Sequence, residues 1–514
     1  MNGAETLIQT FVNAGIDVCF TNPGTSEMHC VAAIDRIEGA RGILALFEGA
    51  VTGMADGYGR MAGKPAFTLL HLGPGLSNAS ANLHNAKRAN SPIINVVGDH
   101  ATYHAQYDAP LASDIAGLAR PVSHWVHSSS SAANLAADGA RAVAAAMTYP
   151  GQIATLIAPA NCAWDAASGP ARQIAPPPLA QPGESSIADA VTALRSGKKT
   201  AILMRGACLM EDGLELAGGI AEASGARLMC DTFHARLQRG AGRVTIEKMP
   251  YFAEDIVEFL AGTERLILIG TKPPVSFFAY PNKPSWMTPE GCEIIHLATP
   301  EQDGIAALRA VAEGLGAKPA QKRQALRRPD LPTGGPFNAY TIGTAVGALM
   351  PENAIVSDEA ATSGNGCYGP TEGCPPHDWL CLTGGSIGQG LPLAAGAAVA
   401  CPDRKVICLH GDGGAMYTVQ SLWTMAREKL DVTVVIFANR KYNILQVELM
   451  RVGAGNPGPG ALNLLDLSNP DLDWVKIAEG MGVAASRAED QDAFNMQFAD
   501  AMKQKGPRLI EAVI

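Results

Sequence analysis

The stretch Lys405-Val-Ile-Cys-Leu-His-Gly-Asp-Gly-Gly414 decides the fold, because it joins an apolar strand to a glycine-rich turn. A second apolar, β-branched run covers residues 432–437 and leads to Asn439. Residues 416–429 between them have helical periodicity, which predicts a strand–helix–strand unit. In parallel α/β sheets, ligands bind at the carboxyl ends of the strands. We therefore expect a ligand site where Asp412 and Asn439 meet.

The residue types in this turn suit a diphosphate and a divalent cation. Gly411, Gly413 and Gly414 let the backbone approach phosphate oxygens, and the next helix offers its N-terminal N–H groups. Asp412 and Asn439, at the tips of neighbouring strands, can share one hard cation. Mg²⁺ suits that place, because it takes few protein oxygens and fills its octahedron with phosphate and water oxygens. An ordinary turn between strand and helix is the alternative, and Asn439 at this spacing argues against it.

This pairing resembles the signature of the thiamine-diphosphate (ThDP) enzymes, in which Gly-Asp-Gly is followed on the next strand by Asn. The resemblance implies ThDP and Mg²⁺ as cofactors, with Asp412, Asn439 and the Lys441 carbonyl as metal ligands. It also implies that the turn, including its glycines, binds ThDP. The family often has Asn-Asn, and Ala438 replaces the first Asn here. The second Asn usually ligates the metal, so the site is expected to survive.

Two Pro-rich stretches, at 170–183 and 317–336, read as linkers that separate three segments of domain size. We expect domains at residues 1–170, 184–316 and 336–514. All three show alternating strand and helix patterns, which predicts the α/β class with three consecutive doubly wound parallel-sheet domains. The resemblance implies the same order, namely a pyrimidine-binding, a central and a diphosphate- and Mg-binding domain.

Short apolar runs give the expected strands of each domain. In the first domain they cover residues 17–20, 42–47, 66–71 and 93–97. In the central domain they cover residues 200–204, 227–230, 265–269 and 293–297. In the third domain they cover residues 354–356, 406–409, 432–437 and 509–513.

The overall composition is that of a compact protein without a charged binding surface. Hydrophobic residues make up 47% of the 514 residues and charged residues 17%, with a net charge of −10. No Lys/Arg-rich run is present, so we expect neither nucleic acid nor membrane as a partner. No apolar N-terminal segment or long apolar stretch indicates secretion or a membrane span. Eleven cysteines without a Cys-x-x-Cys pair are typical of reduced thiols in a cytoplasmic protein.

Glu48 is the candidate catalytic carboxylate, in Ile43-Leu-Ala-Leu-Phe-Glu-Gly49. A lone carboxylate after a mostly apolar run should be desolvated, which suits a group that must share a proton. Ala55-Asp-Gly-Tyr58 follows, and a Glu before Ala-Asp-Gly-Tyr is the family's pattern. The resemblance therefore implies that Glu48 hydrogen-bonds pyrimidine N1′ of ThDP, as both a catalytic and a cofactor-binding residue. A Glu that only interacts with the helix dipole is the alternative.

The run Gly384-Gly-Ser-Ile-Gly-Gln-Gly-Leu-Pro392 resembles the family's turn beneath the cofactor. The resemblance implies Ile387 as the apolar wedge that holds ThDP bent. It places the Gly385 carbonyl and the Ile387 N–H on the aminopyrimidine. A loop that merely packs is the alternative. Thr362 is expected to contact the diphosphate, although a short Thr/Ser loop is ordinarily just a helix N-cap.

Substrate contacts are expected from Thr25, His71 and Phe278. Thr25 falls where benzoylformate decarboxylase has a substrate-binding Ser, and His71 falls at one of that enzyme's catalytic histidines. A His at a strand end can shuttle protons near neutral pH, so His71 is also a catalytic candidate; a structural His is the alternative. Phe278 falls at that enzyme's second histidine, which predicts an aromatic wall. Asn78 and Asn82, on the following helix, are interpreted as packing residues.

The resemblance is closest to acetolactate synthase large subunits and looser to benzoylformate decarboxylase. It implies decarboxylation of a 2-oxo acid and ligation of the resulting enamine to a second carbonyl. Pro110-Leu-Ala112 stands where acetolactate synthases have Phe-Gln-Glu, so a simple 2-oxo acid decarboxylase is the enzyme alternative. A non-catalytic ThDP-binding structural or regulatory paralogue is the alternative of another class.

The family's assembly and its second cofactor complete these expectations. ThDP lies between subunits in the family, which implies a homodimer or homotetramer with the sites between subunits. Some acetolactate synthases bind FAD, but the central domain shows no dinucleotide fingerprint. FAD binding therefore stays open and is not predicted.

Overall fold

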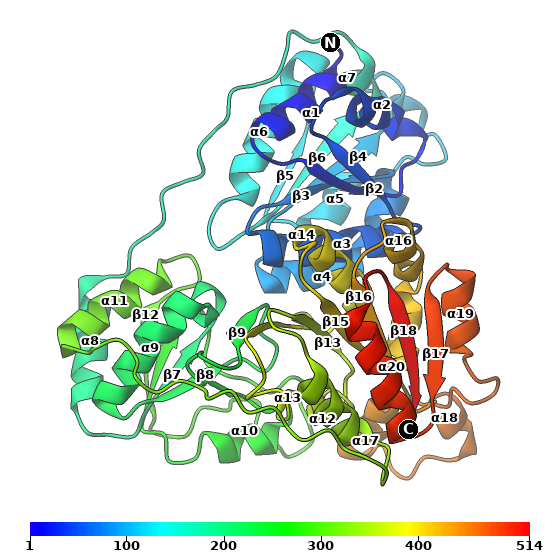
Figure 1. The fold of residues 1–514 in the computed structure, drawn as a ribbon. Helices are drawn as coiled ribbons and strands as arrows, with labels where there is room; N and C mark the ends of the chain where they lie inside the picture. Colours follow the sequence, from blue (N-terminus) through cyan, green and yellow to red (C-terminus); the bar gives the residue numbers. More distant parts are fainter.

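The structure is a computed structural model that describes all 514 residues. Figure 1 shows three α/β units: the N-terminal unit at the top, the middle unit at the lower left and the C-terminal unit at the lower right. Their sheets have six, five and seven strands, and every pairing of these strands except one is parallel. The predicted fold class of three consecutive parallel-sheet α/β domains is therefore confirmed. None of the helices combines the length and the apolar character that a membrane span needs.

The N-terminal sheet has the strand order β2-β1-β3-β4-β6-β5. Its strands are β1 (Val18–Thr21), β2 (Arg41–Leu44), β3 (Ala66–Leu70), β4 (Ile93–Asp99), β5 (Trp125–Ser128) and β6 (Ile153–Pro159). The chain extends to one edge through β2 and to the other through β4, so the strand order reverses between β1 and β3. Such a switch point opens a crevice at the carboxyl ends of the strands, which Thr25 and His71 follow directly.

Helices cover both faces of this sheet. On one face lie α1 (Gly3–Asn13), α2 (Met28–Arg36), α6 (Ala132–Ala146) and α7 (Ala160–Trp164). Phe11, Phe67 and Leu135 belong to the buried core between these helices and the sheet. On the other face lie α3 (Glu48–Ala62), α4 (Leu72–Ala89) and α5 (Ile115–Ala119).

The middle unit has a smaller sheet with the order β10-β8-β7-β11-β12. Its strands are β7 (Thr200–Met204), β8 (Arg227–Cys230), β10 (Glu247–Lys248), β11 (Arg265–Ile269) and β12 (Glu293–Ala298). Its helices are α8 (Glu184–Arg195), α9 (Glu211–Ser224), α10 (Ala253–Phe259) and α11 (Gly304–Leu315). A long extended segment at the left of Figure 1 connects this unit to the N-terminal one.

The C-terminal sheet has the order β17-β18-β16-β15-β13-β14-β9. Its strands are β13 (Ile355–Glu359), β14 (His377–Cys381), β15 (Val406–Gly411), β16 (Val432–Ala438), β17 (Ala484–Ala488), β18 (Arg508–Val513) and β9 (Leu237–Arg239). β9 comes from the middle third of the chain and pairs antiparallel with β14, which ties the two units together. The strand order reverses between β13 and β15, so a second crevice opens at their carboxyl ends.

The helices of the C-terminal unit surround that sheet. They are α12 (Ala339–Leu349), α13 (Asn365–Tyr368), α14 (Gly390–Ala400), α15 (Asp412–Ala415), α16 (Ser421–Arg427), α17 (Asn443–Arg451), α18 (Pro459–Asn463), α19 (Trp474–Gly480) and α20 (Gln491–Lys503). α14 and α16 face the N-terminal unit in Figure 1, whereas α12 and α20 lie on the opposite side of the sheet.

Two predicted elements are wrong in extent. The strand expected at 42–47 ends at Leu44, because the chain turns there to begin α3 at Glu48. The helix expected at 416–429 is interrupted by a 3-10 turn at Met416–Thr418. The Thr418 hydroxyl donates to the Gly388 carbonyl at 2.8 Å, which holds this turn against the loop before α14.

The two outer units share one hydrophobic core. Buried residues of α3, such as Met54, and of α14, such as Leu393, belong to the same continuous cluster. Glycines let the two helices cross closely: a side chain on Gly57 would overlap the Leu393 carbonyl, and one on Gly396 would overlap the Met54 carbonyl. The crossing places the first turn of α3 and the loop before α14 at the same end of the helix pair.

Candidate active site

The glycine-rich turn after β15 forms a cradle around Asp412. The Gly413 N–H donates to Asp412 Oδ1 at 2.8 Å, and the Arg440 N–H donates to Oδ2 at 2.7 Å. These bonds bring the carboxylate to the end of β16, where Asn439 follows. Burial raises the pKa of Asp412, and the two N–H donors oppose that shift. The predicted meeting of Asp412 and Asn439 at neighbouring strand ends is what the structure shows.

This cradle offers oxygen atoms of the kind that bind a hard cation. The Asp412 carboxylate, the Asn439 amide and the Lys441 carbonyl each offer an oxygen atom as a metal ligand. The Asn439 amide oxygen also accepts the Lys441 N–H at 3.1 Å. A side chain on Gly413 would overlap the Tyr442 ring, so glycine is required where the backbone must stay open. The residue set therefore fits both a divalent cation and a phosphate group.

A buried carboxylate, Glu359, ties this cradle to the loop before α14. Glu359 Oε1 accepts the Gly388 N–H at 2.6 Å, and Oε2 accepts the Gly390 N–H. His410 Nε2 lies 3.2 Å from Glu359 Oε2, and both side chains are buried. The His410 ring also packs against Gly414, where a Cβ would lie 3.1 Å from it. Glu359 at the end of β13 and His410 near the end of β15 thus hold the loop before α14 and the glycine-rich turn after β15 in a fixed relative position.

Ile387 projects from that loop beside the cradle. The side chain is 39% exposed, and its Cγ2 lies 3.3 Å from the position that a Gly414 Cβ would take. Gly385 has φ +75°, which only glycine adopts easily, and a Cβ there would lie 2.7 Å from the Phe277 ring. Phe277 therefore covers the loop at Gly385, and Phe278 packs on Phe277 at a ring distance of 4.9 Å; both side chains are exposed.

Thr362 lies on the same edge of the sheet, in the loop after β13. Its hydroxyl accepts a long hydrogen bond of 3.5 Å from Asn443 Nδ2. Asn443 begins α17, shortly after the Asn439 strand end. Thr362 therefore lies beside the start of α17, and its contact with the diphosphate stays a prediction.

Glu48 is the first residue of α3 and lies in the crevice of the N-terminal sheet. It is 8% exposed, and no Lys or Arg pairs with it. Asn78 Nδ2 donates to Glu48 Oε2 at 3.0 Å, whereas Oε1 has no hydrogen-bond partner in the chain. Asn78 is therefore more than a packing residue, because it orients this carboxylate. A Cβ on Gly75 would lie 3.3 Å from both Glu48 Oε1 and His71 Cβ, so Glu48 and His71 flank the same spot.

His71 lies at the end of β3 and faces a cavity of about 310 Å³. Its Nδ1 is 3.0 Å from Glu27 Oε2 and 3.2 Å from the Ser26 hydroxyl. Thr25 lines the cavity, as do Asp99, His100 and His104 from the loop after β4. The apolar part of the wall comes from Leu72, Ala101, Tyr103, Leu111, Ala160 and Trp164.

Two asparagines of α4 connect the N-terminal crevice to the loop before α14. Asn82 Nδ2 donates to the Gly49 carbonyl at 2.8 Å and lies 3.4 Å from the Gly388 carbonyl. Asn85 Nδ2 donates to the Ser386 carbonyl at 2.7 Å. Asn82 is thus also more than a packing residue, because it bonds to both outer units.

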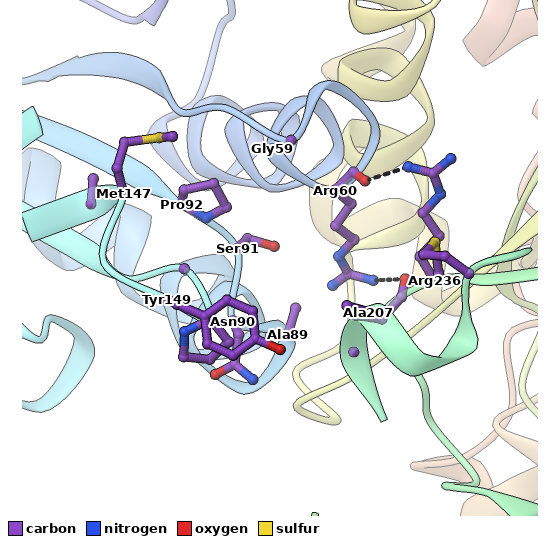
Figure 2. A pocket seen from close by; sticks show the side chains of 17 residues that line it. Gly59, Arg60, Ala89, Asn90, Ser91, Pro92, Met147, Tyr149, Ala207 and Arg236 are labelled. Atoms are coloured by element: carbon purple, nitrogen blue, oxygen red, sulfur yellow. Dashed lines mark hydrogen bonds between the residues drawn. The ribbon is translucent and has the colours of Figure 1, made fainter. Parts of the chain in front are cut away.

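A separate cavity of about 340 Å³ lies between the N-terminal and the middle unit (Figure 2). The carboxyl ends of α3 and α4 and two loops of the middle unit line it. Arg236 donates to the Arg60 carbonyl at 3.1 Å, and Arg60 Nη1 donates to the Ala235 carbonyl at 3.1 Å. Because α3 has 15 residues, this cavity is roughly 20 Å from Glu48 at the other end of the helix. Its arginines join domains and take no part in the site.

The candidate residues thus gather in two groups. The N-terminal group contains Thr25, Glu48 and His71, and the C-terminal group contains Thr362, Gly385, Ile387, Gly411, Asp412, Gly413, Gly414 and Asn439. Sequence reasoning missed Glu27, Glu359 and the hydrogen bond of Asn78. Glu27 follows Thr25-Ser26 and resembles an ordinary helix start, so only its burial beside His71 reveals it.

Two family models match the chain. The thiamine pyrophosphate enzyme N-terminal TPP binding domain covers residues 1–128, and the C-terminal TPP binding domain covers residues 364–512. The first match contains Thr25, Glu48 and His71, and the second contains the C-terminal group except Thr362, which lies two positions before it.

Curated relatives and solved structures agree with the family models. A protein of Mycobacterium tuberculosis strain H37Rv, provisionally named acetolactate synthase large subunit IlvX, is 51% identical over 522 aligned positions, which cover 100% of this chain and 99% of the relative. Benzoylformate decarboxylase of Pseudomonas aeruginosa is 29% identical, covering 97% of this chain and 96% of that protein. The thiamine diphosphate-dependent 4-hydroxybenzoylformate decarboxylase of Rhodococcus jostii RHA1 has the same fold, with a TM-score of 0.85 and 23% identity over 99% of this chain and 98% of that one.

Proposed function

Because the chain belongs to the thiamine pyrophosphate enzymes, we propose that it decarboxylates a 2-oxo acid and ligates the remaining acyl fragment to a second carbonyl compound. The full-length similarity to a protein named as an acetolactate synthase large subunit supports ligation. The family's cofactor, thiamine diphosphate, supplies a carbon nucleophile and an electron sink for loss of CO₂.

Glu48 is the observation that carries this proposal. It is a buried carboxylate whose Oε2 is oriented by Asn78 and whose Oε1 has no partner in the chain. Oε1 is not among the fully buried polar atoms without a partner, so it is reachable from the crevice and free to accept a hydrogen bond from a donor on a ligand. An N–H of the aminopyrimidine is such a donor, and Glu48 would share a proton with that ring nitrogen. A purely structural or regulatory ThDP-binding protein would not need this carboxylate.

The C-terminal residues would hold the rest of the cofactor. The Asp412 carboxylate, the Asn439 amide and the Lys441 carbonyl would bind Mg²⁺, which in turn binds the diphosphate. The open backbone at Gly413 and the Thr362 hydroxyl would meet phosphate oxygens. Ile387 would support the bent cofactor from below, and its loop is held in place through Glu359.

A simple decarboxylase is the second candidate, and the His71 arrangement favours it. Release of an aldehyde requires a proton on the acyl carbon that has lost CO₂. His71 lines the cavity of about 310 Å³, flanks Gly75 together with Glu48 and is hydrogen-bonded to Glu27, which would suit a proton carrier. Benzoylformate decarboxylase of Pseudomonas aeruginosa is similar in sequence over almost the whole chain, and the 4-hydroxybenzoylformate decarboxylase of Rhodococcus jostii RHA1 has the same fold.

The deciding experiment supplies the purified protein with ThDP, Mg²⁺ and a panel of 2-oxo acids, beginning with pyruvate and benzoylformate. Products are resolved by mass spectrometry with and without an added acceptor aldehyde or 2-oxo acid. A 2-hydroxy ketone or 2-hydroxy-2-alkyl-3-oxo acid product supports ligation, and an aldehyde alone supports the second candidate. Absence of CO₂ release from every acid, with ThDP bound, would overturn the proposal.

We further propose that the active form is a homodimer or homotetramer with sites between subunits. Exposed apolar side chains around the cradle support this: Ile387 is 39% exposed, Met416 37% and Tyr417 56%. Apolar side chains grouped at the edge of a site are typical of surfaces that a ligand or a second subunit covers.

A further inference from the structure

Glu27 is a buried carboxylate directly behind the imidazole of His71. It is 2% exposed, and its one ion-pair partner is His71, at 3.0 Å between Oε2 and Nδ1. Oε2 also accepts the Gly24 N–H at 2.8 Å, and Oε1 accepts the Ser26 hydroxyl at 2.8 Å. The Gly24 N–H and the Ser26 hydroxyl are close in sequence to Glu27 and donate to different oxygens of its carboxylate. They therefore hold the carboxylate in one orientation relative to the His71 ring.

The backbone at two glycines lies directly against the Glu27 and His71 side chains. A side chain on Gly24 would overlap the His71 ring, and one on Gly98 would overlap the Glu27 carboxylate. The residue after the histidine, Leu72, has φ +47°, a left-handed conformation that is strained for a non-glycine residue. Three elements, the turn after β1, the end of β3 and the end of β4, therefore converge to hold one imidazole.

We propose that Glu27 is a positioning residue that keeps the Nδ1–H of His71 on its carboxylate and points Nε2 into the cavity of about 310 Å³. This inference rests on the decarboxylase named above as the second candidate function and deepens it. As the imidazolium, His71 would donate its Nε2 proton to the acyl carbon in place of the CO₂ that has left, while the Nδ1–H stays on Glu27. The aldehyde would be released when its hydroxyl gives up a proton and its bond to the cofactor breaks. The imidazole regains the proton from water that reaches it through the cavity.

The charge arrangement suits this duty. Protonation of His71 creates an ion pair with Glu27 in a place that has no arginine or lysine, so the carboxylate stabilises the imidazolium directly. Other titratable groups face the ring: Asp99, His100 and His104 across the cavity, and Glu48 across Gly75. Because Asp99, His100 and His104 share the cavity with His71, the test uses Glu27 variants and the ring tautomer rather than a pH profile.

The test is a double-mutant cycle on the full-length protein with ThDP and Mg²⁺ bound. Glu27→Gln keeps the shape of the side chain and removes its charge. Glu27→Asp keeps the charge but moves the carboxylate away from the His71 ring, because the side chain is one methylene shorter. Each is measured alone and in the His71→Ala background, with Glu48 unchanged. We expect Glu27→Gln to lower kcat for aldehyde release about 10- to 100-fold with KM little changed. Glu27→Asp should recover part of that loss.

In the His71→Ala background, Glu27→Gln should cause no further loss, because Glu27 acts through the imidazole. Losses that multiply would overturn the proposal, since they indicate a structural role. If Glu27→Gln does not fold, Glu27→Asp carries the same cycle. Exchange of the C2 proton of bound ThDP should stay at the wild-type rate in every Glu27 variant, because that step depends on Glu48.

A second readout does not depend on turnover and so separates this proposal from the proposed function. The ¹⁵N NMR spectrum of histidine-labelled protein reports the tautomer of each ring, and His71 is assigned by its loss in His71→Ala. We expect His71 to carry its proton on Nδ1 in the wild type and to change its ring-nitrogen shifts in Glu27→Gln. Unchanged shifts would overturn the positioning role even if a substrate is found.

Discussion

Single side chains in this protein differ in role because their surroundings differ. Glu48 and Glu27 are both buried carboxylates without an arginine or lysine partner. Glu48 has one free oxygen, which suits a ligand that brings a hydrogen-bond donor. Glu27 has both oxygens bonded within the chain, which suits the orientation of a neighbour. Residue type alone does not separate these two functions.

Asp412 provides the test of the metal site. We expect Asp412→Ala to lower the Mg²⁺-dependent affinity for ThDP at least about tenfold, because it removes the only charged ligand of the proposed set. Affinity is measured by titrating ThDP at several Mg²⁺ concentrations. Asp403→Ala, at an exposed carboxylate of the same unit, is the matched control and should leave affinity unchanged. Equal affinities for the two variants would refute the metal assignment.

His234 provides a prediction on pH and stability. Its ring is fully buried between Cys230 and Cys381, and burial lowers its pKa to about 3. Between that value and 6.5, the unfolded chain binds a proton that the folded chain does not. The free energy of unfolding therefore falls as pH drops below about 6.5, by up to about 1.4 kcal/mol per pH unit for this group.

His377, whose pKa burial likewise lowers to about 3, adds to the same trend. We expect His234→Asn to flatten the pH dependence of urea midpoints between pH 5 and 7, whatever its effect at neutral pH. A variant with the wild-type slope would show that His234 titrates normally in the folded protein.

For single residues, the sequence predicts the candidate cofactor- and metal-binding side chains better than the side chains that hold them in place. Asp412, Asn439 and Glu48 stand in local patterns whose chemistry can be read from the chain. Glu359 lies far from His410 in sequence, and only strand pairing places them together. Phe277 and Phe278 are neighbours of equal type, so sequence could not decide which covers Gly385.

Among the elements, the crossing of α3 and α14 fixes the relative position of the two crevices within one chain. Its closeness depends on glycines, as at Gly57, where a methyl group would overlap the Leu393 carbonyl. The helix backbones would have to separate to admit it. The Asn82 bonds to Gly49 and Gly388 depend on the same approach.

We expect Gly57→Ala to destabilise the protein by about 1–3 kcal/mol, because overpacking outweighs the gain in helix propensity. The matched control is Gly480→Ala, in α19, where an added Cβ meets nothing within 4 Å. That variant should be neutral or up to about 1 kcal/mol more stable. Thermal unfolding of both variants provides the comparison, and equal midpoints would contradict the close-crossing account.

The periodicity of the sequence predicted that a strand or helix is present more reliably than it predicted where that element begins and ends. Four of the five strands of the middle unit were expected within a residue of where they lie, because apolar runs bounded by polar residues define them; the two-residue β10 was not expected. The ends of β2 and of the helix after Asp412 were wrong, because tertiary contacts such as Thr418 to Gly388 set them. β9 was not expected, since a three-residue edge strand has no pattern of its own.

On the scale of the whole molecule, the two outer units form one body and the middle unit joins it through β9 and arginines. The shared core of the outer units places both crevices in one continuous structure. The proposed assembly adds a second chain to it, so that residues of two subunits complete each site. Sequence patterns could indicate the three units, but their mutual arrangement depends on contacts between distant segments.

Mixing two inactive variants tests that assembly. Glu48→Gln and Asp412→Ala chains are unfolded or dissociated together and allowed to reassociate. If each site takes Glu48 from one subunit and Asp412 from another, random pairing should restore about a quarter of wild-type activity. Light scattering should report at least twice the chain mass of 53.5 kDa. No restored activity in confirmed mixed dimers would mean that one chain supplies both residues.

The most direct test of the central claim is the rate of hydrogen–deuterium exchange at C2 of bound ThDP, measured by NMR after acid quench. With Mg²⁺ present, we expect exchange in the wild type to be much faster than in free ThDP at the same pH. Glu48→Gln should slow it at least about 100-fold while ThDP stays bound. Exchange in Glu48→Gln at the wild-type rate, or in the wild type no faster than in free ThDP, would contradict the role assigned to Glu48.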